Sequence, residues 1–204
     1  PSSPEQWPAF RDALHRWRQS ARRQIQYSDA LYQRADFQWA SKCFCCGFLM
    51  LCDETLYDRR TGQYRVAETL DDAAGEFGGY DAVVLWHAYP RIGLDDRNQF
   101  DFYRDMPGGL KGLRELADQF HRRNVKVFID YNPWDTGTRR EGKDDLTVLA
   151  EMVGAIEADG IFLDTMDRGA PEFRVALDAI RPGVVLEGEG ALPLERIGDH
   201  HLSW

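Results

Sequence analysis

Acidic and polar side chains that could perform acid–base chemistry follow the apolar runs of this sequence. They are His87, Asp130, Asn132, Asp164, Glu187 and Glu189. A buried carboxylate is costly unless it is paired or functional. Acids that close three successive runs, as Ile-Asp, Leu-Asp and Leu-Glu, therefore indicate one shared site rather than three helix caps. Paired carboxyl groups suit cleavage of a glycosidic bond, because one can protonate the leaving oxygen while the other attacks the anomeric carbon or activates water.

The apolar runs themselves are spaced like the strands of a parallel sheet. Each is followed by a polar or Gly/Pro-rich loop and then by a stretch with helical periodicity, which predicts strands joined by crossover helices. The expected strands are 43–52, 82–87, 125–130, 160–164 and 184–187, with 201–204 as a candidate sixth. The expected helices are 66–77, 110–122, 145–157 and 172–180.

This order favours the α/β class and an incomplete parallel (β/α) TIM-type barrel of about five to six strands. A doubly wound open sheet would give a similar pattern, but the Gly-x-Gly-x-x-Gly turn that usually follows its first strand is absent. The chain has 204 residues, whereas a typical barrel has about 250. Its hydrophobic content is 43%, which is enough for one sizeable core. We expect residues 41–204 to form a partial barrel, whose open edge needs a cover from the remaining barrel segment or a second chain.

Strand parity predicts where the polar side chains point. Side chains alternate between the barrel interior and the helix layer, so Asp164 and Glu187 are expected in one pocket at the carboxyl ends of the strands. Aromatic residues of the same loops could stack on sugar faces, namely Trp86, Tyr89, Tyr131 and Trp134. The residues expected to contact a carbohydrate substrate are His87, Tyr89, Arg91, Asp130, Asn132 and Trp134.

Residues 1–40 precede the first expected strand and contain an amphipathic helix between Glu5 and Gln26. Its apolar residues recur at spacings of three and four, and arginines fill many of the other positions. A basic helical face can bind a membrane surface or an acidic partner. We expect instead a solvated face on a helix that packs against the barrel.

Charge and hydropathy exclude two classes of partner. The chain carries 25 Lys and Arg against 34 Asp and Glu, a net charge of -9, so nucleic acid would meet a repulsive field. The longest apolar run, 43–52, is too short to cross a bilayer, which needs about 20 residues. We therefore expect neither nucleic acid nor a membrane as a partner.

All four cysteines fall within the first expected strand, at positions 43, 45, 46 and 52. We interpret them as small apolar core residues of a buried strand, because no second ligand pair follows at the spacing of a zinc site. Reduced thiols slightly favour a cytoplasmic location over a secreted one. No metal and no cofactor is expected.

About half of the chain, residues 80–189, resembles the catalytic barrels of glycoside hydrolases of the alpha-amylase and alpha-galactosidase kind. The stretch GLKGLRELADQFHRRNVKVFIDYNP, residues 109–133, is similar to the helix and third strand of that group, in which an acid and an Asn close the strand. The stretch DGIFLDT, residues 159–165, is similar to the fourth-strand motif, whose final acid is the nucleophile. The resemblance implies that role for Asp164.

The stretch LEGE at the end of the fifth expected strand resembles the motif that supplies the acid/base in the amylase branch. It implies Glu187 as the proton donor, with Glu189 as the next choice. Amylase-type strands carry an Arg two residues before the nucleophile, where this sequence has Phe162. That departure leaves room for alpha-galactosidase-like or alpha-fucosidase-like relatives, in some of which the proton donor comes from a later strand.

Two other functions compete with glycoside hydrolysis. The first is a barrel that binds carbohydrate without cleaving it, or a partial barrel that is inactive because strands are missing. The second is a metal-dependent hydrolase that uses His87, Asp130 and Asp164. The metal-dependent reading lacks the His-x-His pair that would end the first strand of such an enzyme.

Overall fold

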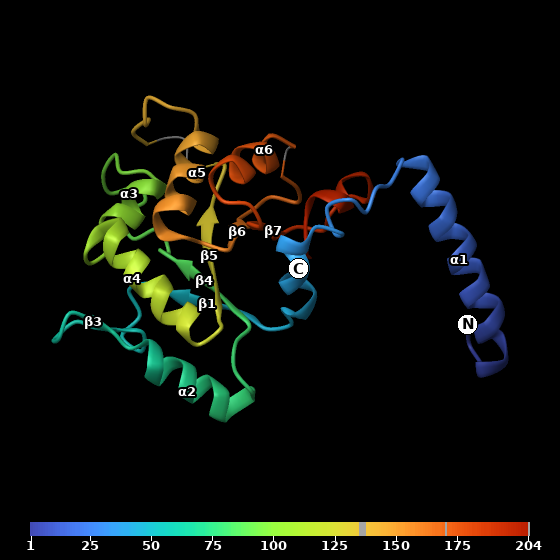
Figure 1. Ribbon diagram of the computed structural model, residues 1–204, viewed down its shortest axis with the longest axis horizontal. Helices are drawn as coiled ribbons and strands as arrows, with labels where there is room; N and C mark the ends of the chain where they lie inside the picture. The colour runs from blue at the N-terminus through green and yellow to red at the C-terminus, as the bar shows by residue number, and fades with distance from the viewer. Residues whose placement is uncertain (135–137, 170, 204) are drawn as a thin grey trace.

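The computed structural model describes residues 1–134, 138–169 and 171–203. Six parallel strands form one sheet in the order β1-β4-β5-β6-β7-β8, curled into a half-barrel (Figure 1). They are β1 (Cys46–Met50), β4 (Ala82–Trp86), β5 (Lys126–Tyr131), β6 (Gly160–Leu163), β7 (Val185–Gly188) and β8 (Leu202–Ser203). Every crossover advances the sheet in one direction, whereas a doubly wound sheet reverses at its switch point. The incomplete TIM-type barrel is therefore confirmed, although Trp204 of the candidate sixth strand lies outside the described residues.

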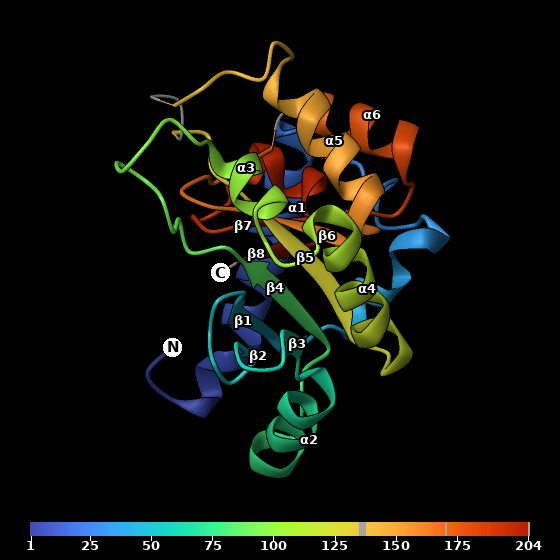
Figure 2. The same cartoon turned by 90° about the vertical axis from the view of Figure 1, so that its left-hand side faces the viewer.

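Helices that alternate with the strands cover the outer face of the sheet. They are α2 (Val66–Phe77), α4 (Gly109–Arg122), α5 (Asp145–Ile156) and α6 (Pro171–Ile180). Figure 2 shows α4, α5 and α6 following one another along this face. Outward strand residues such as Val127 and Ile161 pack with helix residues such as Leu113 and Leu149 into the larger apolar core. A short antiparallel hairpin of β2 (Tyr57–Asp58) and β3 (Gln63–Tyr64) lies in the connection between β1 and α2.

The inner face of the sheet has its own apolar core. Phe128, Phe162 and other inward strand residues pack there with Phe37 and Ala40 of a 3-10 helix, η2 (Ala35–Lys42). The Trp39 ring of η2 contacts the Phe128 ring edge-on, with centroids 6.1 Å apart. Segment 35–42 thus fills the interior below the strand ends that carry the polar residues.

The cysteines do not lie in a buried strand, so this expectation is wrong. Strand β1 begins at Cys46 rather than at residue 43, and it is an edge strand with only β4 as a neighbour in the described chain. An edge strand lacks cover on one side. Residues 43, 45 and 46 are therefore half-buried, Cys52 is exposed, and all four thiols are free.

The N-terminal helix forms as expected, as α1 (Trp7–Gln24) after a 3-10 turn, η1 (Pro4–Gln6). Its expected packing on the barrel is wrong, because no residue of α1 is buried and the helix stands apart from the sheet (Figure 1). The outer layer is already filled by α2, α4, α5 and α6. Within the described ranges, α1 and every other helix fall short of the length and apolar character that a membrane span requires.

Candidate active site

Three polar side chains leave adjacent strands at one level of the half-barrel mouth. The register pairs Tyr131 of β5 with Leu163 of β6, and Leu163 with Gly188 of β7. The next residues along these strands are Asn132, Asp164 and Glu189. The carboxyl ends of parallel barrel strands are where active sites lie, so the register assembles a candidate site there.

The Tyr89 hydroxyl is the centre of this cluster. It hydrogen-bonds to Asp164 Oδ2 and lies 3.1 Å from Asp130 Oδ2, while Asn132 Nδ2 donates to it at 2.8 Å. Asn132 Nδ2 also donates to Asp164 Oδ2 at 3.1 Å. The backbone that carries the Tyr89 side chain is in the left-handed conformation, with φ of 57° at Ala88 and 50° at Tyr89. Such conformations are costly for non-glycine residues and cluster at functional sites.

His87 and Asp130 form a buried pair below Tyr89. Burial lowers the pKa of His87 to about 3. Burial, followed by the charge of Asp164, raises the pKa of Asp130 to about 8. His87 Nε2 and Asp130 Oδ2 are 3.6 Å apart. Both groups are uncharged at neutral pH, so this contact is not a salt bridge.

The His87 ring orientation follows from its backbone contact. Tyr89 N donates to His87 Nδ1 at 3.1 Å, which leaves the proton of the neutral ring on Nε2. Within the described residues, neither His87 Nε2 nor Asp130 Oδ1 has a hydrogen-bond partner. Buried polar atoms normally have one, so this donor and this acceptor are available to a ligand.

The two glutamates of β7 lie at different levels. Glu189 follows the strand, and its Oε2 accepts a hydrogen bond from Thr165 N at 2.5 Å. Glu187 lies in the strand opposite Phe162, is 6% exposed, and its Oε2 is 3.8 Å from Cys46 Sγ across the interior. Glu189 is thus beside the strand end that carries Asp164, whereas Glu187 lies deeper.

The remaining expected contacts are divided between the mouth and the solvent. The Trp134 ring lies 5.7 Å from the Tyr89 ring at an interplanar angle of 31°, and 51% of the residue is exposed. Trp86 contacts Tyr89 edge-on, with centroids 6.0 Å apart. Tyr131 points into the helix-side core. Arg91 is exposed in the loop after β4, and its charge contributes, after the hydrogen bonds from Arg97, to the lowered pKa of Asp95.

A helix that the sequence analysis missed positions the strand ends. Helix α3 (Gln99–Arg104) lies in the long connection after β4. Its Gln99 side chain accepts from Asn132 N at 2.8 Å and donates to Asn132 O at 2.6 Å. The Tyr103 hydroxyl donates to Leu85 O at 2.8 Å and accepts from Asp130 N at 2.7 Å, so it separates β4 from β5 where their ladder ends. A capping box of Asn98 and Asp101 was the available sequence signal for this helix.

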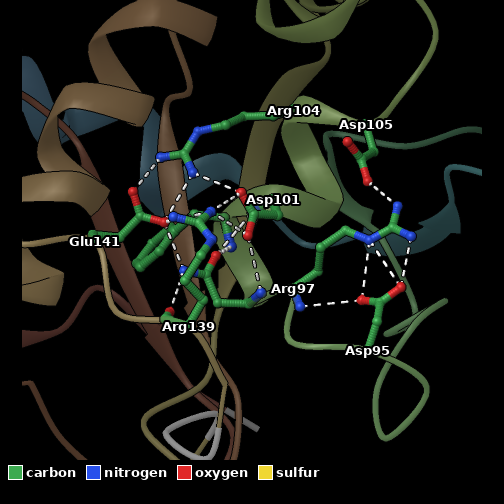
Figure 3. A network of polar contacts seen from close by, with 9 residues as sticks. Asp95, Arg97, Asp101, Arg104, Asp105, Arg139 and Glu141 are labelled. Atoms are coloured by element: carbon green, nitrogen blue, oxygen red, sulfur yellow. Dashed lines mark hydrogen bonds and ion pairs between the residues drawn. The ribbon is translucent and has the colours of Figure 1, made fainter.

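A network of charged residues ties α3 to the segment after residue 137 (Figure 3). Arg139 Nη2 lies 2.5 Å from Asp101 Oδ1, and Arg104 Nη2 lies 2.9 Å from Glu141 Oε2. Arg97 pairs separately with Asp95 and Asp105 at 2.6 and 2.5 Å. The ion pairs of Arg139 and Arg104 join two loops at the mouth. All three arginines are paired with carboxylates of the rim.

The metal-dependent alternative finds no support in the described side chains. Among them, no group of three or more His, Cys, Asp or Glu residues is arranged to hold a metal ion.

No protein-family model matches the sequence, and no curated protein matches it. Solved structures do match, although this chain spans less than half the length of each of the three named here. An alpha-amylase from Geobacillus thermoleovorans, complexed with acarbose, is 19% identical with a TM-score of 0.45, over 72% of this chain and 46% of that one. A cyclomaltodextrinase is 16% identical with a TM-score of 0.49, over 80% and 42%. The pullulanase SAP of GBS, in complex with maltotetraose, is 15% identical with a TM-score of 0.45, over 77% and 29%.

These matches give no support to the alpha-galactosidase kind of relative. At identities of 15–19%, the likeness concerns the fold alone.

Proposed function

We propose that the chain is the catalytic part of a glycoside hydrolase, in which Asp164 attacks the anomeric carbon and Glu189 protonates the leaving oxygen. One observation carries the proposal. Asp164 and Glu189 follow the register pair Leu163 and Gly188 on adjacent strands, and both are partly accessible at the mouth. Two carboxyl groups that flank one bond are the arrangement that glycosidic cleavage uses.

The choice of Glu189 over Glu187 as proton donor rests on position. Glu187 is buried at the level of Phe162 and contacts Cys46, so a substrate at Asp164 would not meet it first. Glu189 is tied to Thr165 N, the residue after Asp164. A proton donor must come within hydrogen-bond reach of the leaving oxygen, and the shallower glutamate meets that condition more directly.

The groups around Asp164 would bind the sugar held there. Asp130 Oδ1 can accept from a hydroxyl and His87 Nε2 can donate to one, and both atoms are without hydrogen-bond partners in the described structure. Tyr89 and Asn132 hold Asp164 Oδ2, which fixes the direction of the carboxylate for attack. Trp134 at the rim offers a stacking face to the next sugar.

The half-barrel supplies one wall of this site. We propose that a remaining barrel segment or a second chain covers the open edge, because exposed strand edges and apolar flanks are normally covered. The activity assay therefore includes the wild-type chain at several concentrations, since a contribution from a second copy would appear as a concentration-dependent specific activity.

The test is hydrolysis of a panel of aryl glycosides by the wild-type chain and three variants. Asp164→Asn should abolish measurable hydrolysis. Glu189→Gln should lower kcat/KM by about 100- to 10,000-fold on substrates with poor leaving groups, and much less on dinitrophenyl glycosides, which need no protonation. Glu187→Gln is the matched control and should retain activity. Unchanged hydrolysis in Asp164→Asn would refute the nucleophile assignment.

The same wild-type and variant proteins also distinguish a hydrolase from a module that binds carbohydrate without cleaving it. Calorimetric binding of an oligosaccharide that is lost in Asp164→Asn, with no hydrolysis of any substrate by the wild type, would favour the binding module. Hydrolysis that disappears only in Glu187→Gln would instead return the proton-donor role to the deeper glutamate.

A further inference from the structure

Helix α1 carries a stripe of large apolar side chains that the described chain leaves uncovered. The stripe consists of Trp7, Phe10, Leu14 and Trp17, at spacings of three and four residues. These residues are 49%, 44%, 46% and 57% exposed. Single exposed apolar residues are ordinary, but a continuous stripe indicates a surface that binds a partner.

The stripe continues onto the body of the molecule. At its C-terminal end, Trp17, Ala21 and Ile25 line a groove of about 190 Å³ together with Leu194 and Ile197 of η3 (Leu194–Asp199). The two η3 residues are themselves 42% and 37% exposed. The surface is therefore joined to the half-barrel rather than confined to a separate helix.

The charge of α1 is opposite to that of the rest of the chain. Residues 1–27 contain five arginines and two acids, so with a net charge of -9 for the whole chain the remaining residues carry -12. Arg11, Arg18 and Arg22 follow one border of the apolar stripe at helical spacing. Two such helices would repel each other, whereas an apolar surface bordered by acids would attract one.

The chain presents an apolar surface with acidic borders at the sheet edge. Phe44, just before β1, is 89% exposed, and Phe77, at the end of α2, is 53% exposed. The Phe77 ring contacts the Tyr80 ring, with centroids 5.0 Å apart. Glu76 precedes Phe77, and Asp81 Oδ2 accepts from Phe44 N at 2.8 Å. We call these five residues the β1 flank.

We propose that α1 of one copy of this chain binds the β1 flank of a second copy, and that two chains exchange these contacts around a two-fold axis. Apolar side chains would then meet apolar side chains, with arginines beside Glu76 and Asp81. Reciprocal exchange closes the assembly at a dimer.

The exchange must occur between two molecules rather than within one. In Figure 1, α1 and α2 lie at opposite ends of the molecule. The segment that connects α1 to the body is fixed near β8 and α6, because the Tyr32 hydroxyl donates to His200 O at 2.8 Å and Arg34 pairs with Asp178. The helix therefore cannot reach its own β1 flank without breaking these contacts.

The first test is the mass of the full chain by sedimentation equilibrium. We expect a dimer, and we expect a Trp7→Glu/Trp17→Glu double variant and a Phe44→Glu variant each to raise the dissociation constant by about 30-fold or more. The three side chains are exposed, so the fold should survive, which circular dichroism checks. Leu94→Glu, at a 74% exposed site in the loop between β4 and α3, is the matched control and should leave the mass unchanged.

The second test identifies which surfaces meet. Chains with Leu14→Cys are mixed with chains with Phe44→Cys, both in a Cys52→Ser background, and treated with a short thiol crosslinker. The mixture should give a crosslinked pair with one chain of each kind, well above the yield from the background chain alone. A chain that stays monomeric at every concentration would overturn the proposal. If that monomer bound anionic vesicles through α1, the stripe would be a membrane-binding surface instead. The proposal would also be overturned by crosslinks only between two Leu14→Cys chains, or by a dimer that the tryptophan variant leaves intact.

Discussion

Replacing Asp130 with Asn should stabilise the protein at neutral pH. Burial and the nearby charge of Asp164 raise the pKa of Asp130 from 3.8 to about 8. The unfolded chain therefore loses this proton at about pH 4, whereas the folded chain keeps it until about pH 8. The folded state binds more protons between these values, so its stability falls as the pH rises through this window.

The magnitude follows from the same two values. One pKa unit corresponds to about 1.36 kcal/mol, and pH 7 lies about 3 units above the pKa in the unfolded chain. At pH 7 Asp130 ionises in the unfolded chain but not in the folded one, and this difference lowers the unfolding free energy by about 4 kcal/mol. Asn has the same shape and does not ionise. Its amide can also keep the contact with the Tyr89 hydroxyl, which lies 3.1 Å from Asp130 Oδ2.

The assay is urea unfolding of wild type and Asp130→Asn at a series of pH values from about 5 to 9. Relative to the variant, the wild type should lose about 1.4 kcal/mol per pH unit up to about pH 7, and the difference should level off above about pH 8. Asp12→Asn makes the same chemical change on exposed α1 and should leave the profile unaltered. Parallel profiles for wild type and Asp130→Asn would show that Asp130 is already ionised in the folded state, and would refute the uncharged pair with His87.

Three further predictions follow from single contacts. Burial raises the pKa of Asp159, but hydrogen bonds from a neighbouring imidazole and a backbone N–H outweigh it and bring the pKa to about 2. Its contribution is therefore complete above about pH 4 and lost towards pH 2, and Asp159→Asn should cost about 2 kcal/mol in urea unfolding at neutral pH. Gly160→Ala should cost about 1–3 kcal/mol, because the added Cβ would overlap the Phe128 ring; an unchanged melting temperature would contradict this. Tyr89→Phe removes a hydrogen bond to Asp164 and should lower kcat/KM by roughly 10- to 100-fold, whereas equal kinetics would leave Tyr89 only a stacking role.

The sequence pattern predicted the strands well and the connections poorly. All five expected strands and the four helices between them are present, since apolar runs and helical periodicity are local signals. The connection after β4 was expected as a loop, yet it contains α3, whose Gln99 and Tyr103 hold Asn132 and Asp130. Those contacts join residues about thirty positions apart, and the periodicity of a short stretch of sequence does not predict contacts over that separation.

The amphipathic pattern of α1 identified a helix but not its neighbour. An apolar stripe indicates that one face of a helix can be buried. The surface against which that face packs depends on which surfaces remain open after the sheet has curled. The cysteines show the same limit. Their apolar surroundings suggested a buried strand, and only the strand order showed that β1 is an edge.

By itself, the sequence determined that the acids face the barrel interior, because side chains of a strand alternate with a period of two whatever the strand pairs with. The level of each acid was decided only by tertiary structure. The pairing of Leu163 with Gly188 sets Glu189 beside the end of β6 and Glu187 one step deeper, against Cys46. Register is a relation between two strands, so the residues of one strand cannot specify it alone.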